Sequence, residues 1–540
     1  MTSSAPQTVR DVFFDVLRQY DLTTVFANPG STEISLLANL PADINFTLAL
    51  HEGSVVGMAT GYALARRKAA MVVVHTTAGL GNAVGAIATA RVNRAPLVIV
   101  VGQQDRRHLA TEPFLAGRLR GLVGEYPVWF NEPVTPLDVP AAVARAYHEA
   151  TTRRGPAIVI VPMDDWLAEY TDERVFPAPV GAVVSGEPSA DTVATVVGHL
   201  DGAKNPVIIA GAGNDTVEGW AALVRLAERT QTPVYQESFA GQAGFPQDHP
   251  LFAGFLSAAR SVLRKQLADF DAVLAVGAPV FRQYNFEPGL MVSPETTVIV
   301  VTNDSDEALR SAATLSVMGD IPSTIAKVAD TVRAASAARA EVPARRTPPP
   351  APTGDEPLRA SHVMATLAEL LPANAIVVEE TPSSRPDMHD LLPARQPLGF
   401  VSAAMGGLGF GLPATIGLRM GAADRPTVGI LGDGSSMYSI QGLWSARHYK
   451  VGALFIILNN GRYAVMDRLA EKYGSSEPAW PPFDEIDFVD LSHALGVPAI
   501  RLSDYASMRS TLDDVVPGLA TRSEPLVLVI DVEPEQHFAP

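Results

Sequence analysis

Short apolar runs, bounded by glycine, proline or polar residues, recur along the chain and alternate with longer segments of helical character. Apolar runs without polar alternation are typical of strands buried on both faces of a parallel sheet. Helical segments between such strands predict right-handed βαβ units, and therefore an α/β fold. The clearest strand-like runs are residues 70–75, 96–101, 207–210, 272–276, 297–301 and 426–431, and a run that begins at Ala453.

The first and last thirds of the chain repeat one order of elements. Strands beginning at residues 70 and 96 are separated by a helix rich in small residues, and those beginning at residues 426 and 453 enclose a helix over 439–449. Each first strand also follows a helix of similar build, over 54–65 or 411–420. We therefore predict that the outer thirds fold as similar modules.

Composition changes along the chain predict three domains. Residues 341–357 have the proline-rich, polar composition of a linker, and a weaker break lies near 180–188. The predicted domains are residues 1–185, 190–340 and 358–540, each a doubly wound parallel sheet covered by helices.

Charge and residue content narrow the range of partners. The 540-residue chain carries 41 basic and 58 acidic residues, a formal net charge of −17, which argues against nucleic acid or an anionic membrane surface. It has no cysteine, and its N-terminal region is interrupted by Arg10, Asp11 and Asp15 where a signal peptide would need an apolar core. We expect a cytoplasmic protein. Two long uncharged stretches, 71–90 and 400–418, contain repeated glycine and predict buried strand-turn-helix units rather than membrane spans.

Polar residues follow two strands of the last third in a pattern that indicates metal chemistry. Gly432-Asp433-Gly434-Ser435 follows one strand and Asn459-Asn460-Gly461 follows the next. Either segment alone is also typical of a simple turn. Together they would bring a carboxylate and a carboxamide to the carboxyl ends of neighbouring parallel strands, where open α/β sheets bind ligands. Such oxygen donors suit Mg²⁺ bound together with a diphosphate.

Seven stretches along the chain carry a resemblance to a known family, namely residues 24–31, 50–52, 74–79, 276–282, 406–410, 432–435 and 459–463. On these stretches the whole chain resembles the thiamine diphosphate (ThDP)-dependent 2-oxo acid decarboxylases, and most closely the benzoylformate decarboxylases among them. The resemblance implies ThDP and Mg²⁺ as cofactors, bound by a pyrimidine-binding first domain and a diphosphate-binding last domain on either side of a central domain. It implies non-oxidative decarboxylation of a bulky 2-oxo acid such as benzoylformate.

The resemblance also implies catalytic roles for four residues. Glu52 corresponds to the glutamate that hydrogen-bonds N1′ of the aminopyrimidine, His75 to a proton-transferring imidazole, and Ser31 to a serine that binds the substrate. Tyr284 stands where benzoylformate decarboxylase has a second histidine. A phenol can donate a proton but is a poor base, so Tyr284 is equally readable as a catalytic or a packing residue.

Cofactor and substrate contacts follow from the same resemblance. Pro382 departs from the hydroxyl residue expected there and removes a donor to the diphosphate. Leu408 corresponds to the apolar wedge that holds ThDP in a V shape. The implied metal ligands are Asp433, Asn460 and the carbonyl of Arg462; the other cofactor contacts are Glu52, Pro382, Ser383, Gly407, Leu408, Gly432, Gly434, Ser435 and Tyr463; the pocket residues are Ser31, His75, Phe114, Leu115, Val465 and Leu469.

Several alternatives stay open at this point. A ThDP-dependent carboligase or lyase would use the same apparatus, and the substrate could be another aryl or a branched-chain 2-oxo acid. A nicotinamide-dependent oxidoreductase is a distant alternative, suggested by the glycines at 79, 81 and 85, and Gly211-Ala212-Gly213 is a weak dinucleotide signal better read as a turn. Because the family places each cofactor between two chains, we expect a homo-oligomer, at least a dimer and by family habit a tetramer.

Overall fold

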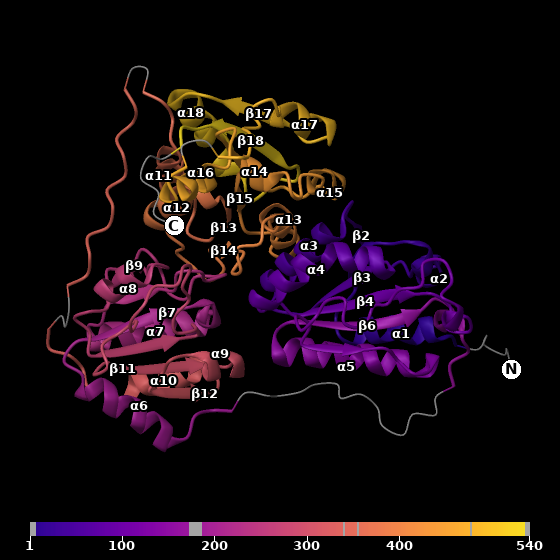
Figure 1. Cartoon of the computed structure of the whole chain (residues 1–540), viewed down its shortest axis with the longest axis horizontal. Helices are drawn as coiled ribbons and strands as arrows, with labels where there is room; N and C mark the ends of the chain where they lie inside the picture. The colour runs from indigo at the N-terminus through magenta and orange to yellow at the C-terminus, as the bar shows by residue number, and fades with distance from the viewer. Residues whose placement is uncertain (1–6, 172–185, 338–340, 354–355, 476–477, 535–540) are drawn as a thin grey trace.

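The computed structural model describes residues 7–171, 186–337, 341–353, 356–475 and 478–534. Within these ranges the named strands form three six-stranded parallel sheets, one after another along the chain. Helices lie on the faces of each sheet (Figure 1). The predicted α/β fold of three doubly wound parallel-sheet domains is confirmed.

The first sheet belongs to the N-terminal domain and has the strand order β2-β1-β3-β4-β6-β5. Apolar clusters cover both faces of this sheet, and its central strands are therefore buried on both sides. Its strands are β1 (Thr24–Asn28), β2 (Asn45–Leu48), β3 (Ala70–Val74), β4 (Leu97–Gln103), β5 (Trp129–Asn131) and β6 (Pro156–Pro162), and its helices are α1 (Val9–Gln19), α2 (Ile34–Leu37), α3 (Glu52–Arg66), α4 (Thr76–Val92) and α5 (Val139–Arg153).

The second sheet forms the middle domain and has the order β12-β11-β10-β7-β8-β9. The chain adds strands on one side of β7 up to β9 and then on its other side from β10 to β12, so the direction of strand addition reverses between β7 and β10. Its strands are β7 (Pro206–Ala210), β8 (Val234–Gln236), β9 (Phe252–Phe255), β10 (Ala272–Val276), β11 (Thr297–Thr302) and β12 (Leu315–Met318), and its helices are α6 (Ala190–Gly202), α7 (Val217–Thr230), α8 (Arg260–Gln266), α9 (Ser305–Arg310) and α10 (Ile321–Thr331).

The third sheet forms the C-terminal domain, with the order β14-β13-β15-β16-β18-β17. This is the order of the first sheet with β13 to β18 in place of β1 to β6, so the predicted repeat of one module is confirmed. The strands are β13 (Ile376–Glu380), β14 (Phe400–Ser402), β15 (Thr427–Gly432), β16 (Leu454–Asn459), β17 (Ala499–Leu502) and β18 (Leu526–Asp531), and the helices are α11 (Ala360–Leu370), α12 (Arg385–Leu391), α13 (Gly411–Gly421), α14 (Asp433–Ser436), α15 (Gly442–His448), α16 (Ala464–Lys472), α17 (Phe488–Ala494) and α18 (Tyr505–Val515).

The elements differ from the sequence-based expectations mainly at their ends. The strand at 272–276 has the predicted bounds, whereas the helix expected over 439–449 begins three residues later, at Gly442. No glycine-rich turn follows the strand at 70–74, because α4 begins directly after His75. The glycines at 79, 81 and 85 therefore lie inside a helix and form no phosphate-binding loop.

Residues 341–353 contain no helix or strand and run along the outer edge of the molecule from the middle sheet toward the last one (Figure 1). This agrees with the linker composition. The break expected near 180–188 falls largely on residues 180–185, which lie outside the described residues, as do 338–340 and 354–355. The domain boundaries themselves stay predictions.

Helices α3 and α13 cross at a glycine contact that joins the N-terminal and C-terminal domains (Figure 1). A Cβ added to Gly61 would lie 2.2 Å from the carbonyl oxygen of Ala414, and one added to Gly417 would lie 1.8 Å from that of Met58. The two backbones therefore approach as closely as they do only because these positions lack side chains. Apolar residues around the crossing form one core that is continuous across both domains.

Membrane spans were considered for two apolar stretches. Among the described residues, no helix is both long and apolar enough to cross a bilayer. The stretches 71–90 and 400–418 fold as β3–α4 and β14–α13 units, as the sequence predicts.

The glycine crossing leads to a stability prediction. We expect Gly417→Ala to lower the free energy of unfolding by about 1–3 kcal/mol, because the new methyl group overlaps the carbonyl of Met58. The midpoint of thermal unfolding measures the effect. The control is Gly198→Ala in α6, where a Cβ meets open space and the same change should leave the midpoint unchanged or raise it. Equal midpoints for both variants would show that the helices do not need the glycine contact.

Candidate active site

The carboxyl ends of β15 and β16 are tied together by the carboxylate of Asp433. One oxygen, Oδ2, accepts hydrogen bonds from the amides of Asn460 and Gly461, both at 2.7 Å, and Oδ1 accepts one from Gly434 at 2.7 Å. Burial raises the pKa of Asp433 above its ordinary value, and these three amides act in the opposite direction. The structure thus places the carboxylate and the carboxamide at adjacent strand ends, as the sequence predicts.

A cavity of about 370 Å³ opens beside this pair. Ser383 lines it and accepts a hydrogen bond from the amide of Val465 at 3.2 Å, which leaves its hydroxyl proton free to donate. Tyr463 packs against Gly434, where an added Cβ would lie 2.4 Å from the ring. The predicted cofactor and metal residues that line this cavity are Pro382, Ser383, Leu408, Gly432, Asp433, Gly434, Ser435, Asn460, Arg462 and Tyr463.

The described residues include no cluster of three or more His, Cys, Asp and Glu side chains that would hold a metal ion. A magnesium site needs no such cluster, because Mg²⁺ commonly takes one or two carboxylates and completes its shell with phosphate oxygens and water. A carboxylate, a carboxamide and a backbone carbonyl beside a cavity fit that chemistry.

The loop that carries Leu408 is held by Glu380 at the end of β13. Its buried carboxyl accepts the amides of Gly409 and Phe410, both at 2.7 Å, and that of Gly411. Burial raises the pKa of Glu380 to about 7, although the amides oppose that shift. Positive φ angles at Gly406 and Gly409 turn the backbone on both sides of Leu408.

The other two domains hold the same loop at Ala404. From the middle domain, Arg282 donates to the carbonyl of Ala404 at 2.9 Å and to that of Phe239 at 3.0 Å. From the N-terminal domain, the side-chain oxygen of Asn93 accepts the amide of Ala404 at 2.9 Å. Since Tyr284 lies two residues beyond Arg282, this contact also sets the tyrosine beside the Leu408 loop.

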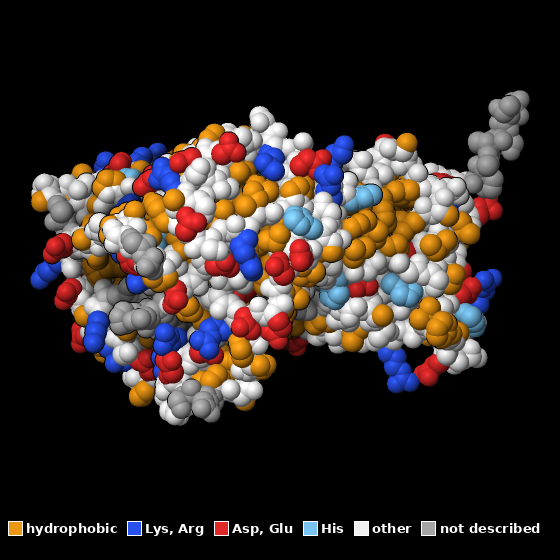
Figure 2. Space-filling model, turned by 90° about the horizontal axis from the view of Figure 1, so that it is seen from above, with side chains coloured by type: hydrophobic (Ala, Val, Ile, Leu, Met, Phe, Trp, Pro, Cys, Tyr) orange, Lys and Arg blue, Asp and Glu red, His pale blue; other side chains and the backbone are white. Residues whose placement is uncertain are grey.

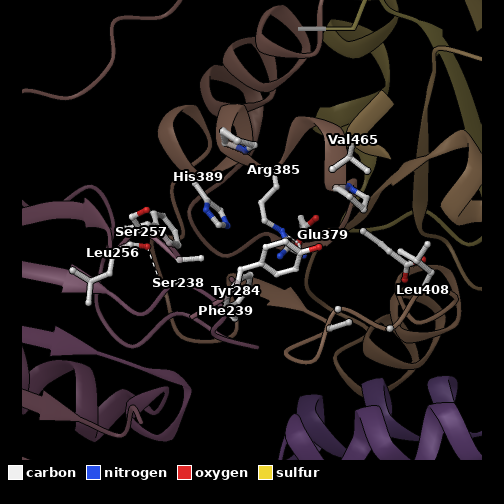
Figure 3. A pocket seen from close by; sticks show the side chains of 18 of the residues that line it. Ser238, Phe239, Leu256, Ser257, Tyr284, Glu379, Arg385, His389, Leu408 and Val465 are labelled. Carbon is white, nitrogen blue, oxygen red and sulfur yellow. Dashed lines mark hydrogen bonds and ion pairs between the residues drawn. The ribbon is translucent and has the colours of Figure 1, made fainter. Parts of the chain in front are cut away.

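A second cavity, of about 490 Å³, lies between the middle and C-terminal domains (Figure 3). It adjoins the first, and the two share Pro382, Leu408, Val465 and Met466 as lining residues. The predicted site residues that line it are Tyr284, Pro382, Gly407, Leu408, Val465 and Leu469. The lining residues of both cavities come from the middle and C-terminal domains.

The N-terminal domain carries the predicted glutamate at the start of α3. Glu52 is buried, and its Oε2 accepts a hydrogen bond from Asn82 at 3.1 Å. Its Oε1 lies beside Gly79, where an added Cβ would approach it to 3.4 Å. His51 caps the helix by accepting the amide of Gly53 at 3.0 Å, so the capping task does not fall on Glu52.

His75 lies at the end of β3, packed over Gly30, where an added Cβ would meet the ring at 2.4 Å. Its Nδ1 is 2.9 Å from the hydroxyl of Thr32 and 3.1 Å from the buried carboxylate of Glu33. Both contacts are made by Nδ1 of His75, so they orient the ring without using Nε2. Ser31, next in the turn, is exposed.

The structure does not bring every predicted residue to the two cavities. Glu52, His75 and Ser31 are absent from their linings, as are the pocket residues Phe114 and Leu115. Phe114 is 87% exposed. In a single chain the predicted site residues are therefore divided between the two cavities and the N-terminal domain.

Sequence reasoning missed four residues that shape these surfaces: Glu33, Asn82, Glu380 and Arg385. The doubled acid Glu379-Glu380 at the end of an apolar strand is a signal that could have been used, because acids seldom end a buried strand without a partner. Glu33 stands directly after Ser31-Thr32 and offered a weaker signal. No local sequence pattern predicts a role for Asn82 or Arg385, because their hydrogen-bond partners are brought to them only by the fold.

Comparisons with known proteins agree with this geometry. Three models of thiamine pyrophosphate (TPP, a synonym of ThDP) enzymes match the chain: the N-terminal TPP binding domain over residues 7–118, the central domain over 193–328 and the C-terminal TPP binding domain over 383–531. The benzoylformate decarboxylase of Pseudomonas aeruginosa is 34% identical over 537 residues, which cover 98% of this chain and 99% of that protein.

Solved structures are similar over the same length. The ThDP-dependent 4-hydroxybenzoylformate decarboxylase of Rhodococcus jostii RHA1 superimposes with a TM-score of 0.92 at 32% identity, over 98% of this chain and 100% of that chain. The benzoylformate decarboxylase of Polynucleobacter necessarius gives a TM-score of 0.91 at 32% identity, over 99% and 100%. The chain therefore belongs to the thiamine pyrophosphate enzyme family and, within it, to the ThDP-dependent decarboxylases that include the benzoylformate decarboxylases.

Proposed function

We propose that the protein is a Mg²⁺- and ThDP-dependent carboxy-lyase that converts an aryl 2-oxo acid of the benzoylformate type to the aldehyde and CO₂. The observation that carries this proposal is the wall shared by the two cavities, with Leu408 between the Asp433 side and the Tyr284 side. A cofactor anchored beside Asp433 thus borders an apolar space suited to an aryl substrate. We also propose a cytoplasmic location, which the lack of cysteine supports.

The metal and diphosphate would be held by the carboxyl ends of β15 and β16. We assign Mg²⁺ to the side chains of Asp433 and Asn460 and the carbonyl of Arg462. Because Oδ1 of Asp433 accepts one amide only, it keeps a lone pair for the ion. Ser383 and Ser435 would donate hydroxyl protons to the diphosphate, whereas Pro382 offers no amide there.

Bound ThDP would supply the electron sink for the loss of CO₂. The chain's own residues would position the reactants and move protons. We assign Glu52 to proton exchange with N1′ of the aminopyrimidine, with Asn82 fixing the orientation of its carboxyl group. His75, fixed through Nδ1 by Glu33, would hold or transfer a proton at Nε2.

Two further residues would complete the substrate side of the site. Ser31, whose side chain is exposed on the N-terminal domain, would donate a hydrogen bond to the substrate's carboxylate. Tyr284 lines the cavity and would act as a proton donor rather than as a base. Because a phenol is a weaker acid than an imidazolium, Tyr284 would give up its proton less readily than a histidine at this position, and this keeps carboligation as a second candidate.

The divided site implies that a second copy of the chain completes it. The N-terminal residues Glu52, His75 and Ser31 would then face the cavities of a partner chain. A broad patch of hydrophobic side chains lies over the N-terminal half of the face in Figure 2, and exposed apolar patches of this kind are typical of association surfaces. We propose a homodimer as the minimum unit and a tetramer as the full assembly.

The reaction itself is tested with benzoylformate. We expect release of benzaldehyde and CO₂ that requires both ThDP and Mg²⁺ and stops after both are removed by chelation and gel filtration. Pyruvate is the control, and its kcat/KM should be at least about 10-fold lower, because it leaves the apolar cavity unfilled. A 2-hydroxy ketone as the main product with added aldehyde would favour the carboligase, and no CO₂ release from either acid would contradict the proposal.

The role of Glu52 is tested by Glu52→Gln. Its amide cannot exchange a proton, so we expect turnover to fall by about 10²- to 10⁴-fold while ThDP stays bound, as measured by steady-state kinetics and cofactor titration. The control is Glu218→Gln, another acid in the first turn of a helix, which lies exposed on α7 and should change neither quantity. A near-normal rate for Glu52→Gln would exclude Glu52 as the activating residue.

Sharing of the site between chains is tested by mixing two inactive variants. Asp433→Ala alone should lose ThDP on gel filtration, and Glu52→Gln alone should be inactive. When the two variants are co-expressed with different tags, about half of the dimers should be mixed, and each mixed dimer has both residues intact in one of its two sites. About a quarter of the wild-type activity should therefore return. If each site is built within one chain, the mixture stays inactive, and the arrangement that we propose is wrong.

A further inference from the structure

Arg385 enters the larger cavity from the first turn of α12. Its Nη2 lies 2.8 Å and its Nε 3.0 Å from Oε2 of Glu379, the residue before the last of β13. The other oxygen of Glu379 accepts the amide of Thr381 at 2.9 Å. Burial acts to raise the pKa of Glu379, but Arg385 and the amide of Thr381 outweigh it and lower that pKa below its ordinary value. Arg385 is thus held by an ionised, buried carboxylate.

The guanidinium stands part-way along the cavity rather than at either end. In Figure 3, Arg385 and Tyr284 lie between Leu408 and Val465 on one side and Leu256 and Ser257 on the other. Leu408 and Val465 form the wall shared with the diphosphate cavity, so the reacting end of a substrate belongs there. The remainder of the substrate would extend toward Arg385.

Arg385 still has hydrogen-bonding capacity. The contacts with Glu379 use Nε and Nη2 of Arg385. Within the described part of the chain, Nη1 of Arg385 has no hydrogen-bond acceptor. The side chain is 22% exposed, which is consistent with a donor group open to the cavity. A planar guanidinium anchored on one edge is well suited to donate from the other.

The size and charge of the cavity limit what Arg385 would bind. A space of roughly 150 Å³ is enough for a benzene ring, whereas this cavity measures about 490 Å³. Glu379 balances the charge of Arg385, and Asp390 also lines the cavity. Burial lowers the pKa of the lining His389 to about 3, so it is neutral. With no surplus positive charge, a neutral oxygen is a better partner than a second carboxylate.

We propose that Arg385, positioned by Glu379, is a specificity-determining residue that donates a hydrogen bond to a hydroxyl group on the ring of an aryl 2-oxo acid. The inference rests on the proposed function, since it concerns the same cavity. It deepens that function by assigning a hydroxylated aryl 2-oxo acid as the preferred substrate class. His389, stacked on Phe255 with ring centroids 3.8 Å apart, contributes a neutral aromatic ring to the lining of the same cavity.

The experiment compares 4-hydroxybenzoylformate with benzoylformate on the holoenzyme. We expect wild-type kcat/KM to favour the hydroxylated acid by about 10-fold or more, the effect of one hydrogen bond to a charged group. Arg385→Met should remove most of that preference, mainly through KM. Arg468→Met is the control, because this arginine of α16 pairs with Glu471 and does not line the cavity, and it should keep the preference.

A double variant keeps the proposal testable if Arg385→Met does not fold. Arg385→Met leaves Glu379 charged and unpaired in the interior, whereas Glu379→Gln/Arg385→Met removes both charges together. Binding of 4-hydroxybenzyl alcohol and benzyl alcohol, measured calorimetrically on the holoenzyme, gives a readout that needs no turnover. Tighter binding of the hydroxylated alcohol by the wild type, lost in either variant, supports the proposal.

The outcomes separate the two proposals. If neither acid releases CO₂, the proposed function fails, while the alcohols still decide whether Arg385 binds a ring hydroxyl. If wild-type protein shows no preference for the hydroxylated compounds, or if the preference survives removal of Arg385, the specificity role is wrong even though decarboxylation proceeds.

Discussion

The loop that carries Leu408 is fixed by contacts from all three domains, and the candidate site depends on this constraint. Glu380 holds it from the C-terminal domain, Arg282 from the middle domain and Asn93 from the N-terminal domain. Each contact uses a charged or amide side chain on a backbone group, so the position of the loop is set by geometry rather than by apolar packing alone. Because Leu408 forms the wall between the two cavities, the relative placement of cofactor and substrate follows from the domain arrangement.

The same arrangement separates the predicted N-terminal site residues from the two cavities within one chain. The glycine crossing packs α3 of the N-terminal domain closely against α13 of the C-terminal domain in the same chain. Glu52 and His75 are thereby committed to a surface that differs from the lining of the two cavities. The crossing thus joins the two domains while leaving Glu52 and His75 outside the two cavities, which in the homo-oligomer that we propose would receive these residues from a second copy.

Sequence reasoning succeeded where chemistry is local and failed where it depends on tertiary contacts. Strands such as β10 are buried on both faces and read as continuous apolar runs, and the Asp433 and Asn460 turns follow directly from two such strands. Arg385 carries no local signal, because its significance comes from a cavity formed with the middle domain. Glu33 was missed because its partner His75 lies 42 positions away.

Pro382 links the departure from the family pattern to the proposed specificity. At the first position of the short 3₁₀ turn Pro382–Ser384, its fixed φ angle suits the turn, and it has no amide proton to donate to a diphosphate in the adjoining cavity. That turn leads directly into Arg385, and the chain between Glu379 and Arg385 must reverse closely enough for the two side chains to pair. The proline that would weaken one contact to a bound diphosphate therefore also helps to form the turn that presents the arginine. On this view the loss of a donor on the diphosphate side and the gain of one on the substrate side are consequences of a single local conformation.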